Sequence, residues 1–171
     1  MTSMEDGGRR GVVTWERLVR YQRAAVRAMD ERLRSTFGHP LEDYDVLHQA
    51  AVHRGPIRMG ELADRLVVAN SSCTRIVGRL VAAGLLERRR GPHDRREVLV
   101  VLTPAGQRLH RRMAAAHTRD IERHFSSRLS EAALDGLDRA VGELLAGTGA
   151  PDRATESPQV GDDRSGRELP R

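Results

Sequence analysis

The stretch NSSCTRIVGRLVAAGLLERRRGPHDRREVLVVLTP, residues 70–104, decides how this chain folds. Apolar residues at helical spacing predict a helix over about 70–82, and Gly84 ends it. The runs 85–90 and 98–102 are apolar and β-prone at their cores, so they predict two strands. The polar loop between them makes the pair a β-hairpin.

The rest of the chain surrounds this stretch with helices. Thr103 and Pro104 predict a helix start, because threonine caps N-termini and proline suits the first turn. Helices are expected over about 14–36, 41–51, 59–66 and 103–124, with a last one ending near Gly147. The order over about 59–102 is that of a helix-turn-helix with a β-hairpin appended. The predicted fold class is therefore mainly α with a small β-hairpin wing.

The helix over 70–82 has two contrasting faces. At 100° per residue its apolar side chains fall within about a 100° stripe that would pack against Leu62 and Leu66. The stripe consists of Cys73, Ile76, Val77 and Leu80. The other side carries hydroxyls and arginines but no acid, namely Ser71, Ser72, Thr74, Arg75 and Arg79. Such a face suits the major groove of DNA; the alternative is an ordinary amphipathic surface helix.

The hairpin loop GPHDRRE, residues 91–97, combines an acid with two arginines. An arginine at a hairpin tip can enter a minor groove, where negative potential is focused. Asp94 would orient Arg96 through a charge-assisted hydrogen bond, and Arg95 would lie near a phosphate. The alternative is a turn in which Asp94 only caps its own backbone.

The charge of the chain supports an anionic partner. The formal net charge is +5 over 171 residues, and residues 75–112 hold ten arginines against three acids. A basic patch of this kind indicates nucleic acid first, with a solvated surface as the alternative.

The segment GELADRLVVANSSCTRIVGRLVAAGLLERRRGPHDRREVLVVLTPAG, residues 60–106, resembles the MarR family of winged-helix regulators. The likeness covers the helix-turn-helix, the Asp-x-Arg wing and the Leu-Thr-Pro-x-Gly entry to the next helix. It implies a MarR-type domain over 13–147, with a winged helix-turn-helix over about 41–102. The dimerisation helices would span about 14–36 and 103–147.

The resemblance also implies partners. Family members are homodimers that bind palindromic operators, commonly as repressors that respond to a small aromatic ligand or an oxidant. By position, the DNA contacts would be Ser71, Ser72, Thr74, Arg75 and Arg79, with Arg95 and Arg96 in the wing and Asp94 as their orienter. Two residues depart from the family pattern: Ala69 replaces a capping Ser or Thr, and Gly78 stands where Asp is frequent.

Composition narrows the function classes. There is no lysine, one cysteine and no clustered set of metal ligands, so no enzyme motif, cofactor or metal site is predicted. No membrane span or secretory signal is visible, which favours a cytoplasmic protein. Residues 1–12 are expected to be a flexible segment and 148–171 a disordered tail. The competing hypotheses are a ligand-responsive repressor and a sequence-tolerant architectural DNA-binding protein.

The single cysteine, three regularly spaced histidines and four aromatic residues each have a structural as well as a functional interpretation. Cys73 lies on the inward stripe and is expected to act as a small hydrophobe rather than a sensor. His110, His117 and His124 recur every seven residues and are expected to form a polar stripe along the dimer helix rather than a metal site. The aromatic residues Trp15, Tyr21, Phe37 and Tyr44 could line an effector pocket, although ordinary core or interface packing is the plainer reading.

Overall fold

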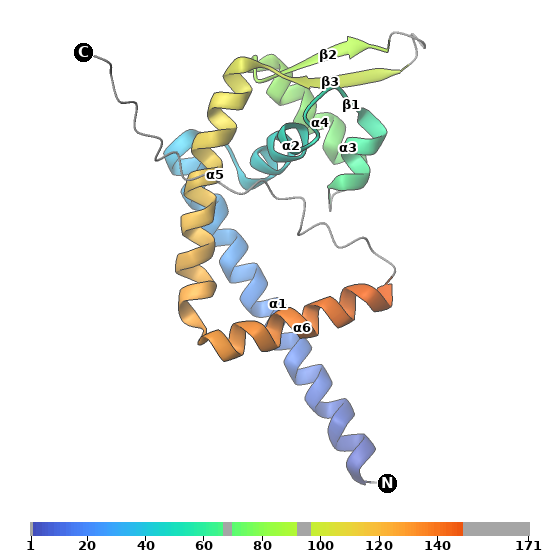
Figure 1. Cartoon of the computed structure of the whole chain (residues 1–171), viewed down its shortest axis with the longest axis vertical. Coiled ribbons are helices and arrows are strands. Elements are labelled where there is room, and N and C mark those ends of the chain that lie inside the picture. Colours follow the sequence, from blue (N-terminus) through green and yellow to red (C-terminus); the bar gives the residue numbers. More distant parts are fainter. Residues whose placement is uncertain (1, 67–69, 92–96, 149–171) are drawn as a thin grey trace, which may run out of the picture. The chain divides into compact units, whose positions relative to one another are not determined.

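The computed structural model describes residues 2–66, 70–91 and 97–148, with residues 2–6, 70 and 71 described by their backbone alone. In chain order the elements are α1 (Thr2–Phe37), α2 (Leu41–Val52), β1 (Ile57–Arg58), α3 (Met59–Arg65), α4 (Asn70–Ala82), β2 (Leu86–Arg90), β3 (Val98–Leu102), α5 (Pro104–His124), the 3-10 helix η1 (Ser126–Arg128) and α6 (Glu131–Thr148) (Figure 1). The predicted mainly α fold with a small wing is confirmed.

The first helix begins earlier than predicted. Residues 2–12, expected to be a flexible segment, are helical and belong to α1, so that expectation is corrected. Three glycines in this stretch argued against a helix, since each disfavours helix by about 1 kcal/mol. No proline interrupts the run, and nothing stops the helix until Gly38, which has a φ of 73°.

Helix α4 ends as its sequence predicts. Gly84 has a φ of 70°, the left-handed conformation that glycine adopts without strain. The Gly84 amide donates to Val81 O and the Leu85 amide donates to Leu80 O, both at 2.9 Å. This is the Schellman arrangement, and it turns the chain from α4 directly into β2.

The three strands form one antiparallel sheet in the order β1-β3-β2. Strands β2 and β3 pair from Leu86↔Leu102 to Arg90↔Val98, as a hairpin requires. The sequence did not predict β1, whose two residues pair with Val100 and Leu99. Two residues are too few to show an alternating pattern, so only the tertiary pairing reveals this strand.

Thr103 joins the hairpin to α5. Its hydroxyl oxygen accepts from the Gly106 amide at 3.0 Å, which confirms the predicted cap, and the hydroxyl donates to Gly84 O at 2.8 Å. The next turn of α5 lies so close to the hairpin that a Cβ on Gly106 would sit 2.1 Å from Leu85 O. The ends of α4, β2 and α5 are therefore fixed together.

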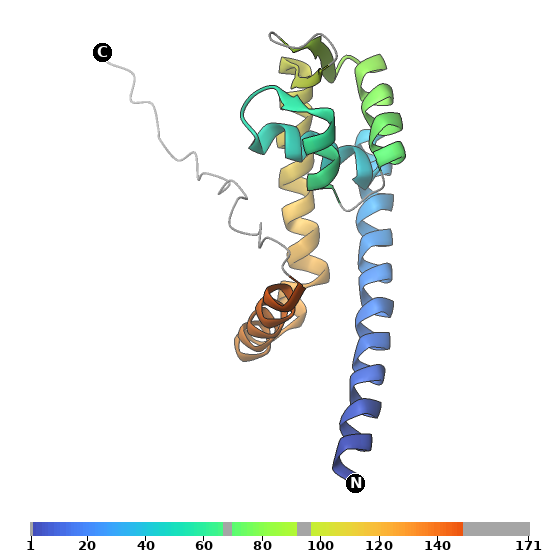
Figure 2. The same cartoon turned by 90° about the vertical axis from the view of Figure 1, so that its right-hand side faces the viewer.

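The core fills the space between α2, α3, α4, the sheet and the first half of α5. Its largest fully buried side chains include Leu33, Leu47, Ile57, Leu62, Ile76, Leu80, Leu86 and Met113. Helices α1 and α5 run alongside one another below this core (Figure 2). The Asp120 carboxylate, fully buried, lies 3.0 Å from Arg32 Nε, and Tyr21 donates to His124 O at 2.5 Å.

Helix α6 belongs to a second compact unit, which begins at Glu131. No residue of α6 is buried within the described part of the chain. Among the helices described, none is both long and apolar enough to cross a bilayer. The predicted tail lies outside the described residues, except for Thr148 at the end of α6.

Candidate nucleic-acid interface

The inward stripe of α4 is buried as predicted. Cys73, Val77 and Leu80 have no exposed surface, and Ile76 is 1% exposed. They form one cluster with Leu62, and Leu66 packs against it. Burial raises the pKa of the Cys73 thiol, which disfavours the reactive thiolate. This packing fixes the rotation of α4 and so determines which side chains reach solvent.

The outward side of α4 holds the polar residues that the sequence selected. Thr74, Arg75 and Arg79 are exposed, and Ser72 is half-buried. For Ser71 only the backbone is described, and Ala69 lies outside the described residues. The contacts predicted on α4 thus share one helix, with Ser72 turned partly inward.

Two of these residues are ion-paired with α2, which sequence reasoning missed. Arg79 binds Asp43, with its Nε 3.2 Å from Oδ1, and also Glu42 at 2.8 Å. Arg75 Nη2 lies 3.5 Å from the second oxygen of Glu42. The hydrogen bonds that Arg79 donates to Asp43 and, with a smaller effect, to Glu42 raise the pKa of Arg79. The acids precede the arginines by more than 30 residues, so helical spacing gave no signal of these pairs.

The wing strand adds another arginine beside α4. Arg88 of β2 is exposed, and its Nη2 donates to Thr74 O at 3.4 Å. A Cβ on Gly78 would lie 3.7 Å from that same nitrogen, so the guanidinium lies over the glycine. Gly78, one of the departures from the family pattern, thus lies beneath a cation from β2. The available signal was the period of two in a strand, which places Arg88 on the same face as the buried Leu86.

Asp94, Arg95 and Arg96 lie outside the described residues, and their predicted roles stay predictions. The stem beneath them is ordered into a regular ladder that closes with the Gly91 amide donating to Glu97 O at 3.0 Å. Glu97 also lies 2.9 Å from Arg58 Nε of β1.

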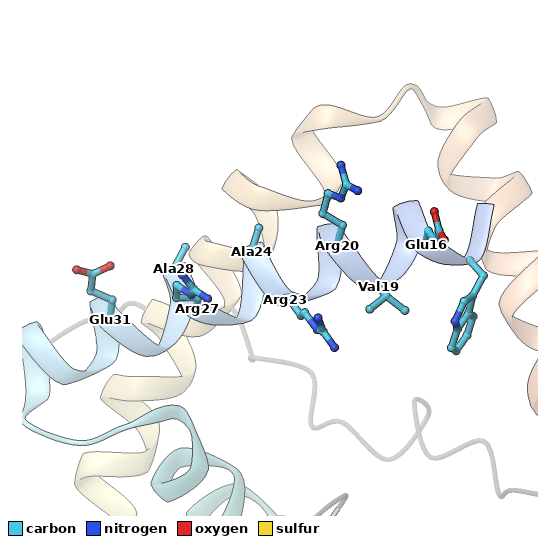
Figure 3. A pocket seen from close by; sticks show the side chains of 9 residues that line it. Glu16, Val19, Arg20, Arg23, Ala24, Arg27, Ala28 and Glu31 are labelled. Atoms are coloured by element: carbon cyan, nitrogen blue, oxygen red, sulfur yellow. The ribbon is translucent and has the colours of Figure 1, made fainter. Parts of the chain in front are cut away.

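The four aromatic effector candidates have different surroundings. Tyr21 lies near Phe125, with ring centroids 6.5 Å apart, and Phe37 receives the Arg112 guanidinium at 5.4 Å. Tyr44 is buried in the core. Trp15 lines a groove along α1, whose charged lining is Arg20, Arg23 and Arg27 together with Glu16 and Glu31 (Figure 3).

Tyr44 instead lies in a cluster of imidazoles between α2 and α5. Its ring stacks on His48 and His110, and His117 is tilted against it at 4.7 Å. His48 Nδ1 and His110 Nε2 are 3.2 Å apart. In the predicted stripe of histidines along α5, His110 and His117 face α2 within the same chain. Among the described residues, no group of three potential ligands could hold a metal ion.

Together the fold and this surface define a winged helix-turn-helix protein. A model described as the MarR family matches residues 37–97. The structure is similar to AbsC, a MarR family transcriptional regulator from Streptomyces coelicolor, with 28% identity, a TM-score of 0.70, and coverage of 79% of this chain and 93% of that one. Over its winged helix-turn-helix the chain is therefore similar to the MarR family of transcriptional regulators.

Two further relatives agree with this assignment. A mutant MarR from E. coli complexed with operator DNA has 25% identity and a TM-score of 0.69, covering 79% of this chain and 96% of that one. An HTH-type transcriptional regulator from Bacillus subtilis (strain 168), YcgE, is 31% identical over 110 residues. That match spans 64% of this chain and 60% of the relative.

Proposed function

We propose that this chain is a sequence-specific DNA-binding repressor that acts in the cytoplasm as a homodimer on a palindromic operator. The observation that carries the proposal is the rotation of α4, whose apolar stripe is buried while Thr74 and Arg75 face solvent. A helix held this way offers hydroxyls and a guanidinium to a major groove. The similar E. coli protein in complex with operator DNA supports the same use of the fold.

The wing would contact the neighbouring minor groove. Residues 92–96 connect β2 to β3 in the sequence, and Arg95 and Arg96 are the proposed contacts with Asp94 as their orienter. The exposed arginines of β2, Arg88 among them, add positive charge beside α4. Ser71, Ser72 and Thr74 would bind phosphates or base edges, which position and read the site respectively.

Apolar surface outside the core supports the homodimer. On α6 the side chains of Leu134, Leu137, Val141, Leu144 and Leu145 fall on one stripe at 100° per residue. None of them is buried in the described part of the chain, and Leu144 is 65% exposed. On α1, Trp15 is 66% exposed and Val12 59%. A second copy of the chain would bury such stripes, and a two-fold pair places two α4 helices about one DNA turn apart.

We further propose that a small aromatic effector regulates DNA binding by this chain. Trp15 is the aromatic candidate that lines the α1 groove, beside three arginines that could receive an anionic substituent. Because the lining residues that the structure describes all come from α1, a second copy of the chain would complete the groove at the dimer contact. Such a site would couple ligand binding to the geometry of the pair.

The test is binding of the full chain to genomic fragments selected by the protein, followed by anisotropy titration on the recovered palindrome and on shuffled duplex. We expect affinity for the palindrome of about 10⁻⁸–10⁻¹¹ M and a steep loss with salt. Arg75→Ala and Arg96→Ala should weaken binding with the fold intact, whereas Arg119→Ala on α5 should not. Equal affinity for shuffled duplex would favour the sequence-tolerant architectural protein, and no binding at low salt would reject both.

A further inference from the structure

The arginines of α4 meet a pair of neighbouring acids on the first turn of α2. Glu42 and Asp43 precede Arg75 and Arg79 by 33 and 36 residues in the chain, yet the side chains form one network. The acids also lie at a helix N-terminus, where negative charge is favoured by the helix dipole. Two negative charges on α2 therefore face two positive charges on α4.

The two acids differ in burial. The Asp43 side chain is 1% exposed and its second oxygen lies 2.9 Å from His39 Nδ1, so every approach to it is occupied by protein. Arg79 reaches the other oxygen through both Nε and Nη2. A buried carboxylate that loses its only guanidinium would keep an uncompensated charge, which is strongly unfavourable. Asp43 and Arg79 are therefore expected to stay together when the surface of α4 is occupied.

The position of Asp43 is itself fixed from α1. Asp30 accepts from the Leu41 amide at 2.8 Å, and thereby caps α2 where Pro40 offers no side-chain cap. The second oxygen of Asp30 accepts from Arg34 Nε at 2.6 Å. The first turn of α2 thus has little freedom to follow Arg79 toward a ligand.

Glu42 has the opposite character. Its side chain is 34% exposed, and its two oxygens are divided between Arg79 at 2.8 Å and Arg75 at 3.5 Å. The Arg75 side chain is 61% exposed. A pair this accessible contributes little stability, because water and salt compete with it. Arg75 can therefore exchange Glu42 for a phosphate oxygen with only a small loss of free energy from the broken pair.

We propose that Asp43 and Glu42 divide the two arginines of α4 into a positioning residue and a DNA contact. Asp43 holds Arg79 in an ion pair that joins α2 to α4, so Arg79 is a positioning residue and does not contact phosphate. Glu42 holds Arg75 in the free protein and opposes its transfer to DNA, so it lowers affinity. This inference rests on the proposed DNA binding, and it departs from the sequence prediction that Arg79 contacts DNA.

The first experiment compares Glu42→Gln with wild type by anisotropy titration on the same duplex. The variant should bind about fivefold more tightly at low salt, because one opposing charge at the surface is removed. The gain should shrink as salt is raised, and it should vanish when Glu42→Gln is combined with Arg75→Ala. Glu122→Gln, an exposed acid on α5, matches the change in net charge and should leave affinity unaltered.

The second experiment separates the two arginines by their salt dependence. Arg75→Ala should reduce the slope of log affinity against log salt by about one, as expected for a lost phosphate contact. Arg79→Ala should lower the melting temperature and keep the wild-type slope. An equal fall in slope for both variants would show that Arg79 also contacts phosphate and would overturn its positioning role. Unchanged or weaker binding by Glu42→Gln would overturn the role of Glu42. If the wild type itself ignores duplex DNA, the proposed function fails instead.

Discussion

Helix α2 carries two polar clusters, one of ion pairs and one of aromatic and imidazole rings, and they differ in how polar groups are kept beside the core. Its first turn pairs Glu42 and Asp43 with arginines of α4, and its middle places Tyr44 and His48 against His110 and His117 of α5. Both clusters sit beside the hydrophobic core. The first keeps its charges because each has a counter-ion nearby, whereas no acid in the described part of the chain forms an ion pair with His110.

The imidazole cluster is therefore held neutral. Burial, with smaller contributions from the charges of His48 and Arg111, lowers the pKa of His110 to about 4. Burial also lowers the pKa of His48 and of His117, although Asp120 opposes the latter shift. Burial and then Asp45 raise the pKa of Tyr44 to about 12, so its hydroxyl stays protonated at neutral pH. The contrast shows that a charge survives beside this core only where a partner is supplied.

The largest expected effect is loss of stability in acid. The unfolded chain binds a proton at His110 near pH 6.5, whereas the folded chain resists until about pH 4. Stability from the neutral ring is complete above pH 6.5 and is lost as pH falls toward 4, by about 3 kcal/mol for a shift of this size. Urea unfolding monitored by circular dichroism between pH 7.5 and 4.5 measures this loss.

His110→Phe keeps an aromatic ring against Tyr44 and removes the titrating group, so the fall in stability with acid should become shallower. His124→Gln, on the same helix but outside the imidazole cluster, serves as the control and should retain the wild-type profile. An unchanged acid dependence in His110→Phe would show that the buried ring does not govern it.

The next effect in size concerns the charged cluster. Asp43→Asn retains the shape of the side chain but leaves Arg79 without its buried counter-charge, and stability should fall by about 2 kcal/mol, moderated because Arg79 is partly exposed. Chemical denaturation at pH 7 measures the change. A variant as stable as wild type would mean that the pair does not join α2 to α4.

The smallest effect is expected at the neighbouring acid. Glu42→Gln removes the more exposed carboxylate, so stability should change by less than about 0.5 kcal/mol. The same denaturation experiment compares it directly with Asp43→Asn. Comparable losses in the two variants would erase the distinction between a buried and an exposed partner.

The features that the sequence predicted are local ones. The bounds of α4, its inward stripe, the glycine that ends it and the Thr103 cap all follow from residues within one or two turns of each other. Each is determined by periodicity or by backbone geometry, which a single sequence displays. The winged helix-turn-helix could be recognised for that reason.

The features that sequence reasoning missed depend on contacts between distant segments. Arg79 meets Asp43 across 36 residues, β1 exists only through its pairing with β3, and His110 stacks on Tyr44 of α2. Helical angles fix which residues share a face but not what that face meets. The extended start of α1 shows the reverse error, since local glycine preference gave the wrong bound.

The most direct measurement of the central claim is sedimentation of the full chain with a fluorescent duplex that carries the selected palindrome, at low and moderate salt. The account predicts a dimer without DNA and two protomers on each duplex, with affinity reduced by Arg75→Ala and unaffected by Arg119→Ala. A monomer in solution, or a chain that does not sediment with the duplex at low salt, would contradict it.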